Sequence, residues 1–323
     1  MNPVRTTSLL LALALGITPS WGAADAPVLT TIHVGTTNNS DSSLEPVYAK
    51  AGGLFKRSGL DARVESFSSG GAILDAVVAG ALDVGFTNIA SAGAALARGL
   101  PIVLLAPSML YTSKSPINFL VAARGSTLKT GADFAGKTIG VSTLTGELQI
   151  GASAWIDRAG GDAKSVHFVE IPFAAMVPAL KQGRIDAAVL SEPAFTENKD
   201  DIEYIGDASA GIGSRFLVAG FVSSKAWVAA NPETARRFVT AMLLTARWAN
   251  THRAETGRIL AEERKTDPAI VAVMNRATFG DALTAAIVQP LLDAAYKYGT
   301  LKQPVKGADL IADAAPFWTQ GIR

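Results

Sequence analysis

The sequence predicts an α/β protein of two lobes, each with a central, mostly parallel β-sheet flanked by helices. Three observations lead to this expectation. The length of 323 residues exceeds what a single hydrophobic core usually supports, roughly 250–300 residues. A unit of alternating strands and helices occurs twice, and such alternation forms parallel sheets with right-handed crossovers. A polar, Pro-containing connection separates the two copies.

The duplication is visible in three short matches that keep their order along the chain. AVVAGALDVGF at 76–86 corresponds to ALKQGRIDAAV at 179–189. Upstream, KRSGLD at 56–61 corresponds to DRAGGD at 157–162, and IHVGT at 32–36 to TIGVS at 138–142. Chance similarity between Ala-rich helices is the alternative. The preserved order of three elements favours a true internal repeat.

Each copy predicts the order strand, helix, strand, helix, strand. Glycines 59, 80, 160 and 183 follow the helices, where a C-terminus favours positive φ. Asn231 and Pro232 begin a mostly helical remainder. We expect strands at 31–36, 62–67, 82–87, 138–142, 165–171 and 185–190. We expect helices at 43–57, 71–80, 146–159, 173–183, 232–250, 255–265, 268–278, 281–298 and 307–318.

The connections between the copies set the predicted domain organisation. The segment 101–124 carries a polar joint and leads into the second lobe, and the apolar run 216–222 returns the chain. We therefore expect residues 28–112 and 229–323 in lobe 1 and residues 113–228 in lobe 2. The hinge is expected around 112–116 and 190–216, with the C-terminal helices mainly in the first lobe.

The first 24 residues have the pattern of a cleaved signal peptide. Arg5 gives a positive start, residues 9–17 are apolar, and Gly22-Ala23-Ala24 offers small residues to a signal peptidase. This apolar stretch is shorter than the roughly 20 residues of a membrane span. A buried N-terminal helix is the alternative. Because the chain contains no cysteine for lipid attachment, we expect a freely soluble periplasmic protein that starts at Asp25.

Composition and motifs argue against several other functions. The net charge of +1, without long runs of one sign, predicts no nucleic-acid or membrane binding through a basic patch. The three histidines, 33, 167 and 252, are far apart, and the chain has neither cysteine nor a G-x-S-x-G elbow. GADFAGKT at 131–138 matches a phosphate loop but opens a predicted strand instead of a helix. We expect no enzyme activity, catalytic residue, metal or cofactor.

The loops that follow the strands are the candidate ligand site, because open α/β sheets bind ligands at the carboxyl ends of their strands. Several loops place hydroxyl or amide groups at a helix N-terminus, whose free N–H groups attract carboxylates and sulfonates. Simple N-capping is the alternative for each residue. The candidate ligand-binding residues are Thr37, Asn38, Asn39, Ser40, Ser68, Ser69, Gly70, Thr87, Asn88, Ser142, Thr143, Thr145, Gly146, Phe173 and Glu192.

The charges in these loops limit the ligand further. They contain no Lys or Arg, which argues against a multiply charged anion such as a phosphate ester unless Lys114, Arg124 or Arg215 swings in. Glu147 and Glu192 can accept N–H groups from a heterocycle, on which Phe173 or Tyr111 would stack. For Glu192 the favoured interpretation is that it braces the hinge, because Pro193 stiffens the next turn.

Short motifs in a fixed order also resemble one known family. They begin with Pro46–Lys50 and Gly53–Asp61 and continue through 76–83, 97–101, 133–140, 183–187, 191–193 and 231–232. Together they resemble the nitrate/sulfonate/taurine-type periplasmic solute-binding proteins of ABC transporters. The resemblance implies a periplasmic-binding-protein type II fold with two hinge connections and no catalysis. It also implies, as partners, a small-molecule solute and the permease with its cytoplasmic ATPase; we expect a monomer.

The sequence leaves the chemical class of the ligand open. The leading expectation is a small organic anion, a sulfonate or carboxylate, which is captured between the lobes and delivered to the permease. The same module could instead bind a heteroaromatic vitamin precursor of the thiamine-pyrimidine or riboflavin type. A ligand-sensing partner of a membrane receptor is a further alternative. A fungal enzyme branch of the family would need a cysteine-rich motif, and this chain has no cysteine.

Overall fold

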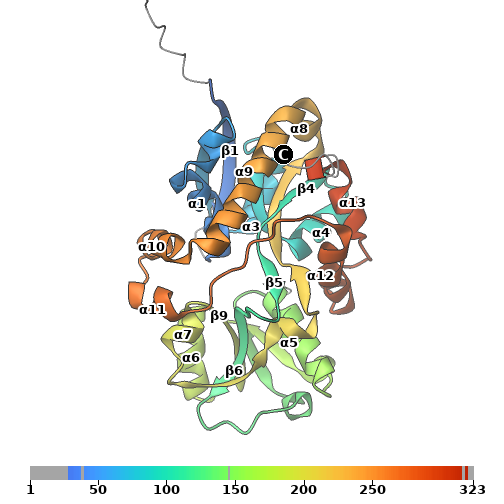
Figure 1. The fold of residues 1–323 in the computed structure, drawn as a ribbon. Coiled ribbons are helices and arrows are strands. Elements are labelled where there is room, and N and C mark those ends of the chain that lie inside the picture. The colour runs from blue at the N-terminus through green and yellow to red at the C-terminus, as the bar shows by residue number, and fades with distance from the viewer. Residues whose placement is uncertain (1–27, 38–39, 145, 315–316, 319–323) are drawn as a thin grey trace, which may run out of the picture.

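Two five-stranded sheets, each with its own helices, form the two halves of the molecule (Figure 1). The computed structural model describes residues 28–37, 40–144, 146–314 and 317–318. The predicted signal peptide, 1–24, lies outside these residues. None of the helices in the described part of the chain is both long and apolar enough to cross a membrane.

The first sheet has the strand order β2-β1-β3-β12-β4. Its strands are β1 (Thr30–Thr37), β2 (Leu60–Phe67), β3 (Val84–Asn88), β4 (Ile102–Pro107) and β12 (Ala219–Ser224). β1 pairs in parallel with β2 and β3, whereas β12 runs antiparallel to β3 and β4. We call this sheet and its helices the first half.

The second sheet repeats the same plan with the order β10-β6-β9-β7-β8. Its strands are β6 (Asn118–Ala123), β7 (Thr138–Val141), β8 (His167–Glu170), β9 (Ala187–Ser191) and β10 (Ile202–Asp207). β7 is parallel to β8 and β9, and β6 is antiparallel to β9 and β10. The duplicated unit thus forms the parallel part of each sheet, and the α/β fold class predicted from sequence is confirmed.

Three helices of the duplicated unit, α3 (Gly70–Val78), α5 (Glu147–Arg158) and α6 (Phe173–Lys181), lie close to their expected positions. In contrast, α4 (Ile89–Ala97), which follows β3, was not among the expected helices. The helix expected over 43–57 is instead two helices, α1 (Glu45–Ala51) and α2 (Leu54–Arg57). Gly53 separates them because its φ of 66° lies in the left-handed region, which interrupts a right-handed helix.

The chain crosses between the halves through two short strands that pair with each other. β5 (Leu110–Thr112) runs antiparallel to β11 (Arg215–Leu217). The return crossing is therefore complete before β12. The expected end of lobe 2 at residue 228 was too late, because β12 at 219–224 hydrogen-bonds within the first sheet.

The C-terminal helices cover the first half but also reach the second. They are α8 (Lys225–Ala230), α9 (Pro232–Thr251), α10 (Arg253–Arg264), α11 (Pro268–Val273), α12 (Ala285–Lys297) and α13 (Gly307–Ile311). Figure 1 places α11 above α7 (Ala194–Glu197) on one side of the crossing and α12 above α5 on the other. At the second contact, Lys297 Nζ and Tyr298 Oη both donate to Asp157, at 2.8 and 2.9 Å.

α11 ends at Val273, earlier than the expected residue 278. The chain then runs beside the crossing, where Leu110 N donates to the carbonyl of Thr278 and Met109 bridges to Phe279. These backbone bonds replace the helical ones, so the segment after α11 is held extended at the junction of the halves.

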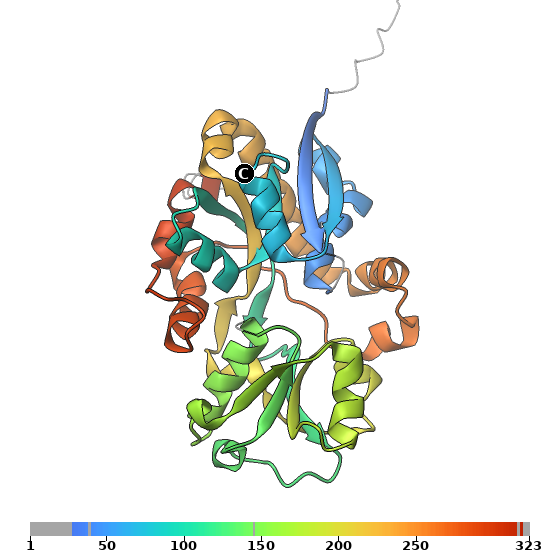
Figure 2. The ribbon, with the colours of Figure 1, turned by 180° about the vertical axis from the view of Figure 1, so that it is seen from behind.

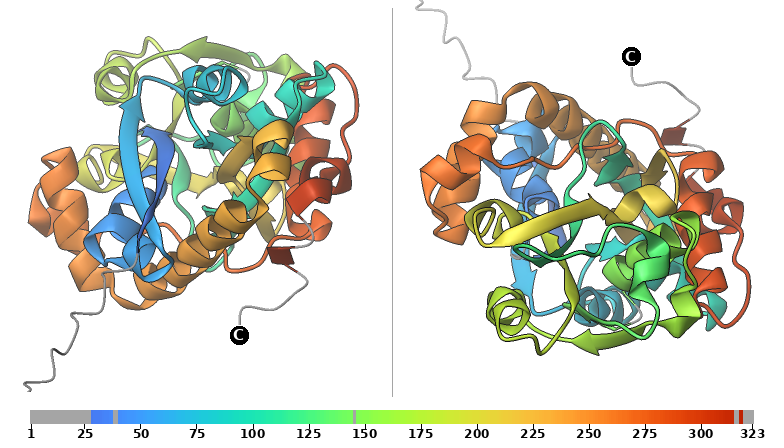
Figure 3. Two further views of the ribbon diagram at one scale, coloured as in Figure 1. Left: turned by 90° about the horizontal axis from the view of Figure 1, so that it is seen from above. Right: turned by 90° about the horizontal axis from the view of Figure 1, so that it is seen from below.

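The halves have largely separate hydrophobic cores. The main cluster of the first half packs β1, β3, β4 and β12 against α4, α9 and α12. Two clusters of the second half lie on either face of its sheet and draw only on residues between 119 and 208. Figures 2 and 3 show the blue N-terminal strands and the red C-terminal helices at opposite edges of the first half. Ile150 of α5 is the exception, because it packs into the cluster of the first half. The space between the halves is therefore bordered by two walls with largely separate cores.

Candidate functional site

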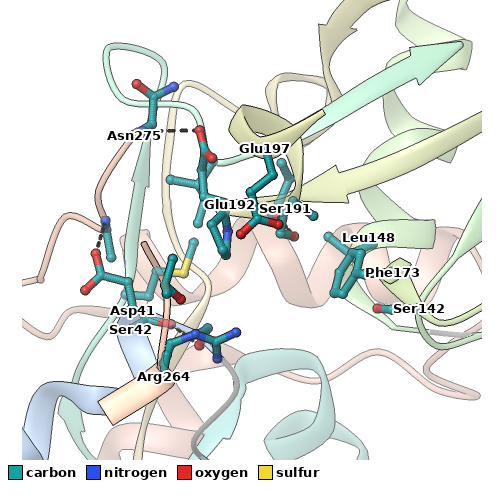
Figure 4. Close-up of a pocket in the computed structure, with 18 of the residues that line it drawn as sticks. Asp41, Ser42, Ser142, Leu148, Phe173, Ser191, Glu192, Glu197, Arg264 and Asn275 are labelled. Carbon is teal, nitrogen blue, oxygen red and sulfur yellow. Dashed lines mark hydrogen bonds between the residues drawn. The ribbon is translucent and has the colours of Figure 1, made fainter. Parts of the chain in front are cut away.

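A cavity of about 680 Å³ lies between the two halves (Figure 4). The first half contributes the loop after β1, the end of β3 and the segment around α10 and α11. The second half contributes the start of β6, the loops after β7 and β9, and the first turns of α5 and α6. The ends of the parallel strands from both duplicated units thus face one shared cleft, large enough for a small organic molecule.

Five of the fifteen candidate ligand-binding residues line this cavity: Ser40, Asn88, Ser142, Phe173 and Glu192. Asn38, Asn39 and Thr145 lie outside the described residues. The structure places the remaining candidates, Thr37, Ser68, Ser69, Gly70, Thr87, Thr143 and Gly146, outside the cavity lining. Contact with a ligand stays a prediction for the five that line it.

N-capping accounts for two of the candidates. Ser69 Oγ accepts from Ala72 N at 3.2 Å at the start of α3, and Asn88 Oδ1 accepts from Ala90 N at 2.8 Å at the start of α4. Asn88 also lines the cavity, whereas Ser69 does not. A Ser or Asn at the end of a strand is therefore compatible with both helix capping and a place in the cavity lining, and the sequence alone does not separate these roles.

Asp41 lines the cavity but is already neutralised by a cation. Arg276 Nε and Nη2 donate to its two carboxylate oxygens at 2.7 and 3.1 Å, and both side chains are 9% exposed. Tyr48 Oη and Ala277 N also donate to Asp41, at 2.6 and 2.9 Å. Burial and the adjacent Asp41 raise the pKa of Tyr48. The pair joins the β1 loop to the segment after α11 and has a structural role.

Glu192, at the end of β9, connects the halves at the edge of the cavity. Its carboxylate accepts from Thr196 Oγ1 at 3.1 Å, within the second half. It also accepts from Asn275 N at 3.1 Å, on the segment that follows α11 (Figure 4). Burial raises the pKa of Glu192 above its usual value. These contacts favour the bracing role that sequence suggested over direct ligand contact.

Glu147, the first residue of α5, is the centre of a polar cluster in the second half. Asn118 Nδ2 donates to both of its carboxylate oxygens at 3.1 Å, and Ser209 Oγ donates to Oε1 at 3.1 Å. Asn118 Oδ1 in turn accepts from Ser191 Oγ at 2.6 Å. Burial raises the pKa of Glu147 to about 7. In the described structure all its hydrogen-bond donors are neutral.

Tyr111 belongs to the crossing and not to the cavity. Its ring lies 4.8 Å from that of Phe216 between centroids, and its hydroxyl donates to Asp207. Only 1% of Tyr111 is exposed. The suggestion that Tyr111 stacks on a ligand is therefore wrong, because its ring is occupied by the paired strands β5 and β11.

Apolar side chains line the cavity from both halves. Phe173 and Val177 on α6 and Leu148 on α5 line it from the second half. Phe86 and Val218 line it from the first half. Figure 4 shows Leu148 and Phe173 next to each other, beside Ser142. These side chains can bury a hydrocarbon or aromatic body of a ligand.

Carboxylates outnumber cations around the cavity. Apart from Asp41, which is paired with Arg276, Glu147, Glu192, Glu197 and Asp267 line it, against Arg264 and Lys265. The two cations come from the end of α10, which sequence analysis did not consider as part of the site. Asn118 was also missed, because it stands at the start of a strand that enters from the crossing, and only the topology brings that end beside α5.

Comparison with known proteins identifies the family. The family model described as NMT1/THI5 like matches residues 43–256. A protein of Brucella abortus (strain 2308) that is described only as a binding protein is 27% identical over 73% of this chain and 71% of its own.

Solved structures show the same fold at low identity. The periplasmic aliphatic sulphonate binding protein of Escherichia coli has a TM-score of 0.72 and 17% identity, and covers 87% of this chain and 91% of its own. The periplasmic nitrate-binding protein of Synechocystis PCC 6803 has a TM-score of 0.70 and 17% identity, with 92% and 89% covered. The fold is that of periplasmic binding proteins, and the chain belongs to the NMT1/THI5-like family.

Proposed function

We propose that this protein is the extracytoplasmic solute-binding subunit of an ABC importer. The observation that carries the proposal is the 680 Å³ cavity between two separately packed halves that are joined by one pair of strands. The family match and the likeness to sulphonate-binding and nitrate-binding periplasmic proteins support it. Binding and release are the whole chemistry, without a catalytic step.

The proposed mechanism is closure of the cleft around the solute. A ligand that contacts both walls favours the closed arrangement by its greater affinity for that arrangement. β5 and β11 form the flexible connection, and the contacts of Glu192 with Asn275 and of Asp157 with Lys297 adjust as the halves move. The permease with its ATPase then recognises the closed form.

The lining also bears on the ligand class. A small organic anion, the leading expectation from sequence, would meet more carboxylates than cations in this cavity. A ligand with N–H donors, such as a heteroaromatic vitamin precursor, finds acceptors on Glu147 and an aromatic surface on Phe173. The lining therefore favours the second ligand class over the first.

Export and solute binding are tested on the full-length chain. We expect a periplasmic product whose intact mass corresponds to a start at Asp25. Saturating solute at about 100 times its dissociation constant should add roughly 2.7 kcal/mol of stability, visible as a higher Tm. X-ray scattering should then show a smaller radius of gyration. A protein that stays cytoplasmic, or that binds a solute without changing its dimensions, would contradict the proposal.

A further inference from the structure

Glu147 is a carboxylate that lines the cavity and has no cationic partner among the described residues. Its donors in the described structure are the amide of Asn118 and the hydroxyl of Ser209. The charged group that acts on it through space is Asp207, which is also a carboxylate. Removal of a carboxylate from water is costly unless a positive charge compensates it.

A comparison with Asp41 shows that Glu147 lacks a cationic partner among the described residues. Both carboxylates line the same cavity and both accept hydrogen bonds from neutral donors. Asp41 also has the guanidinium of Arg276 at 2.7 Å. Glu147 Oε2 accepts only from Asn118 Nδ2 among the described residues, although a carboxylate oxygen can accept two hydrogen bonds. A position for one further donor therefore remains at Oε2.

The groups around α5 do not supply a cation at this end of the helix. Asp207 precedes the turn at 208–211, and Glu192 follows β9. Lys297 on α12 is paired with Asp157, close to the opposite end of α5. The remaining charged groups on the short turns that pack against α5 are Asp133 and Lys164. Asp133 caps its own turn at Thr130, and Lys164 lies in the turn that follows the end of α5.

We propose that the solute carries a protonated nitrogen, an ammonium or amidinium group, which binds Glu147 Oε2 while its apolar body lies against Leu148 and Phe173. This inference rests on the proposed function and names the ligand class of the same cavity. The cation replaces the missing partner of Glu147. The neutral donors Asn118 and Ser209 hold the carboxylate in place.

The proposal fixes the direction of proton exchange. Because burial holds the pKa of Glu147 at about 7, the group is partly protonated near neutral pH. A cation binds the ionised form, so binding releases a proton and affinity rises with pH. From about pH 6 to about pH 8 the ionised fraction, and with it the affinity, rises about tenfold. An anion that binds protonated Glu147 shows the opposite trend.

The first experiment compares benzamidine, benzamide and benzoate, which share one skeleton and carry positive, zero and negative charge. Thermal shift and calorimetry on the exported protein should show binding of benzamidine with proton release. Because the buffer takes up the released proton, the measured heat of binding should become more exothermic as the ionisation enthalpy of the buffer increases. Tighter binding of benzoate than benzamidine, or proton uptake on benzamidine binding, would overturn the proposal.

The second experiment uses matched variants. Glu147→Gln keeps the size and the acceptor oxygen but removes the charge, and should weaken benzamidine at least tenfold while benzamide changes little. Glu203→Gln removes the same charge from an exposed site on β10 and should change the affinity for benzamidine by less than about twofold. Equal effects of both variants would contradict direct contact.

The outcomes also separate this inference from the proposed function. Closure of the cleft around benzoate or benzamide, with no response to benzamidine, would refute the cation and leave the solute-binding role in place. If Glu147→Gln fails to fold, the buffer dependence of the wild-type protein still decides the sign of proton exchange. Failure of every probe, whatever its charge, to bind would count against both proposals.

Discussion

Glu45, at the start of α1, is a fully buried carboxyl group, and its burial outweighs the stabilising effect of the nearby Ser108 on the ionised form. It is 0% exposed, and within the described structure neither of its oxygens has a hydrogen-bond partner. Burial therefore raises its pKa well above the usual value, so Glu45 keeps its proton to a higher pH in the folded protein than in the unfolded chain. In the unfolded chain the same group ionises in its ordinary range.

This difference predicts that Glu45 destabilises the fold as pH rises. Above the unfolded pKa the unfolded chain releases a proton that the folded protein retains, so the free energy of unfolding falls with increasing pH. Glu45→Gln should raise Tm at about pH 8 and change it much less at about pH 4.5. Each kcal/mol gained corresponds to roughly 2–4 °C or less for a chain of this size.

Thermal unfolding of wild type and variant at both pH values measures the effect. Glu262→Gln, an exposed position on α10, is the control and should leave Tm unchanged at both. An identical Tm difference at the two pH values would show that folding does not raise the pKa of Glu45.

The buried pair of Asp41 and Arg276 stabilises the fold, so its removal should lower the free energy of unfolding, in contrast to the replacement of Glu45. Arg276→Met leaves Asp41 without its cation in a site where both side chains are 9% exposed. Loss of one partner of a buried ion pair costs about 3–5 kcal/mol. Arg236→Met breaks the exposed pair with Glu233 and should cost about 1 kcal/mol or less. Denaturant unfolding compares the two, and equal losses would contradict the structural role of Arg276.

At the scale of single residues, sequence identified chemical types better than roles. Ser69 and Asn88 were chosen as polar groups at strand ends, and both cap helices. Glu147 was recognised as an acceptor, but its neighbours Asn118 and Ser209 are 29 and 62 residues away along the chain. Only the folded topology places those donors on its carboxylate.

At the scale of elements, the turn at 208–211 packs against α5 with almost no space between the backbones. A Cβ atom on Gly211 would lie 2.2 Å from Trp155 N and 2.7 Å from Ala154 O. Neither backbone atom can move without shifting α5. This contact holds Ser209 beside Glu147, so the packing of one turn sets the geometry of the cavity.

Gly211→Ala should therefore separate the turn from α5. We expect a loss of about 1–3 kcal/mol in the free energy of unfolding, typical of overpacking. Gly213→Ala, in the same loop, is the control, because its nearest neighbour would be Phe216 Cδ1 at 3.8 Å. Urea titrations of both variants measure the difference. A Gly211 variant as stable as the control would show that the two backbones separate freely.

The strands of the duplicated unit and its helices α3, α5 and α6 were predictable because their patterns are local, whereas α4 was not predicted. Alternating apolar residues and C-terminal glycines place β1 to β3 and β7 to β9 within a few residues of their observed bounds. The long helix over 43–57 was not predictable as two, since its apolar periodicity continues across the break at Gly53. The antiparallel strands come from the connections, which carry no repeated pattern.

At the scale of the whole molecule, the second half is an insertion between two paired strands. Thr112 and Arg215 are partners in the antiparallel ladder of β5 and β11, so the ends of the inserted segment lie side by side. The core clusters of the inserted segment use residues between 119 and 208. The lobe boundary at 228 was missed because β12 looks like a continuing apolar run until its partners are known.

This arrangement predicts that residues 110–217 fold without the rest of the chain. A segment with its own core and adjacent ends meets the usual conditions for an independent domain. We expect a monomeric fragment with dispersed NMR amide signals and a single cooperative urea transition. A fragment that lacks fixed tertiary structure would show that α12 and the segment after α11 are needed to complete the second half.

The separation of the two cores also has an evolutionary consequence. Substitutions far apart and without shared neighbours have nearly additive effects on stability. A change in the lining of one half therefore leaves the folding of the other half undisturbed. New solute specificities can then arise in successive single steps, with one wall of the cavity drifting while the other preserves the existing contacts.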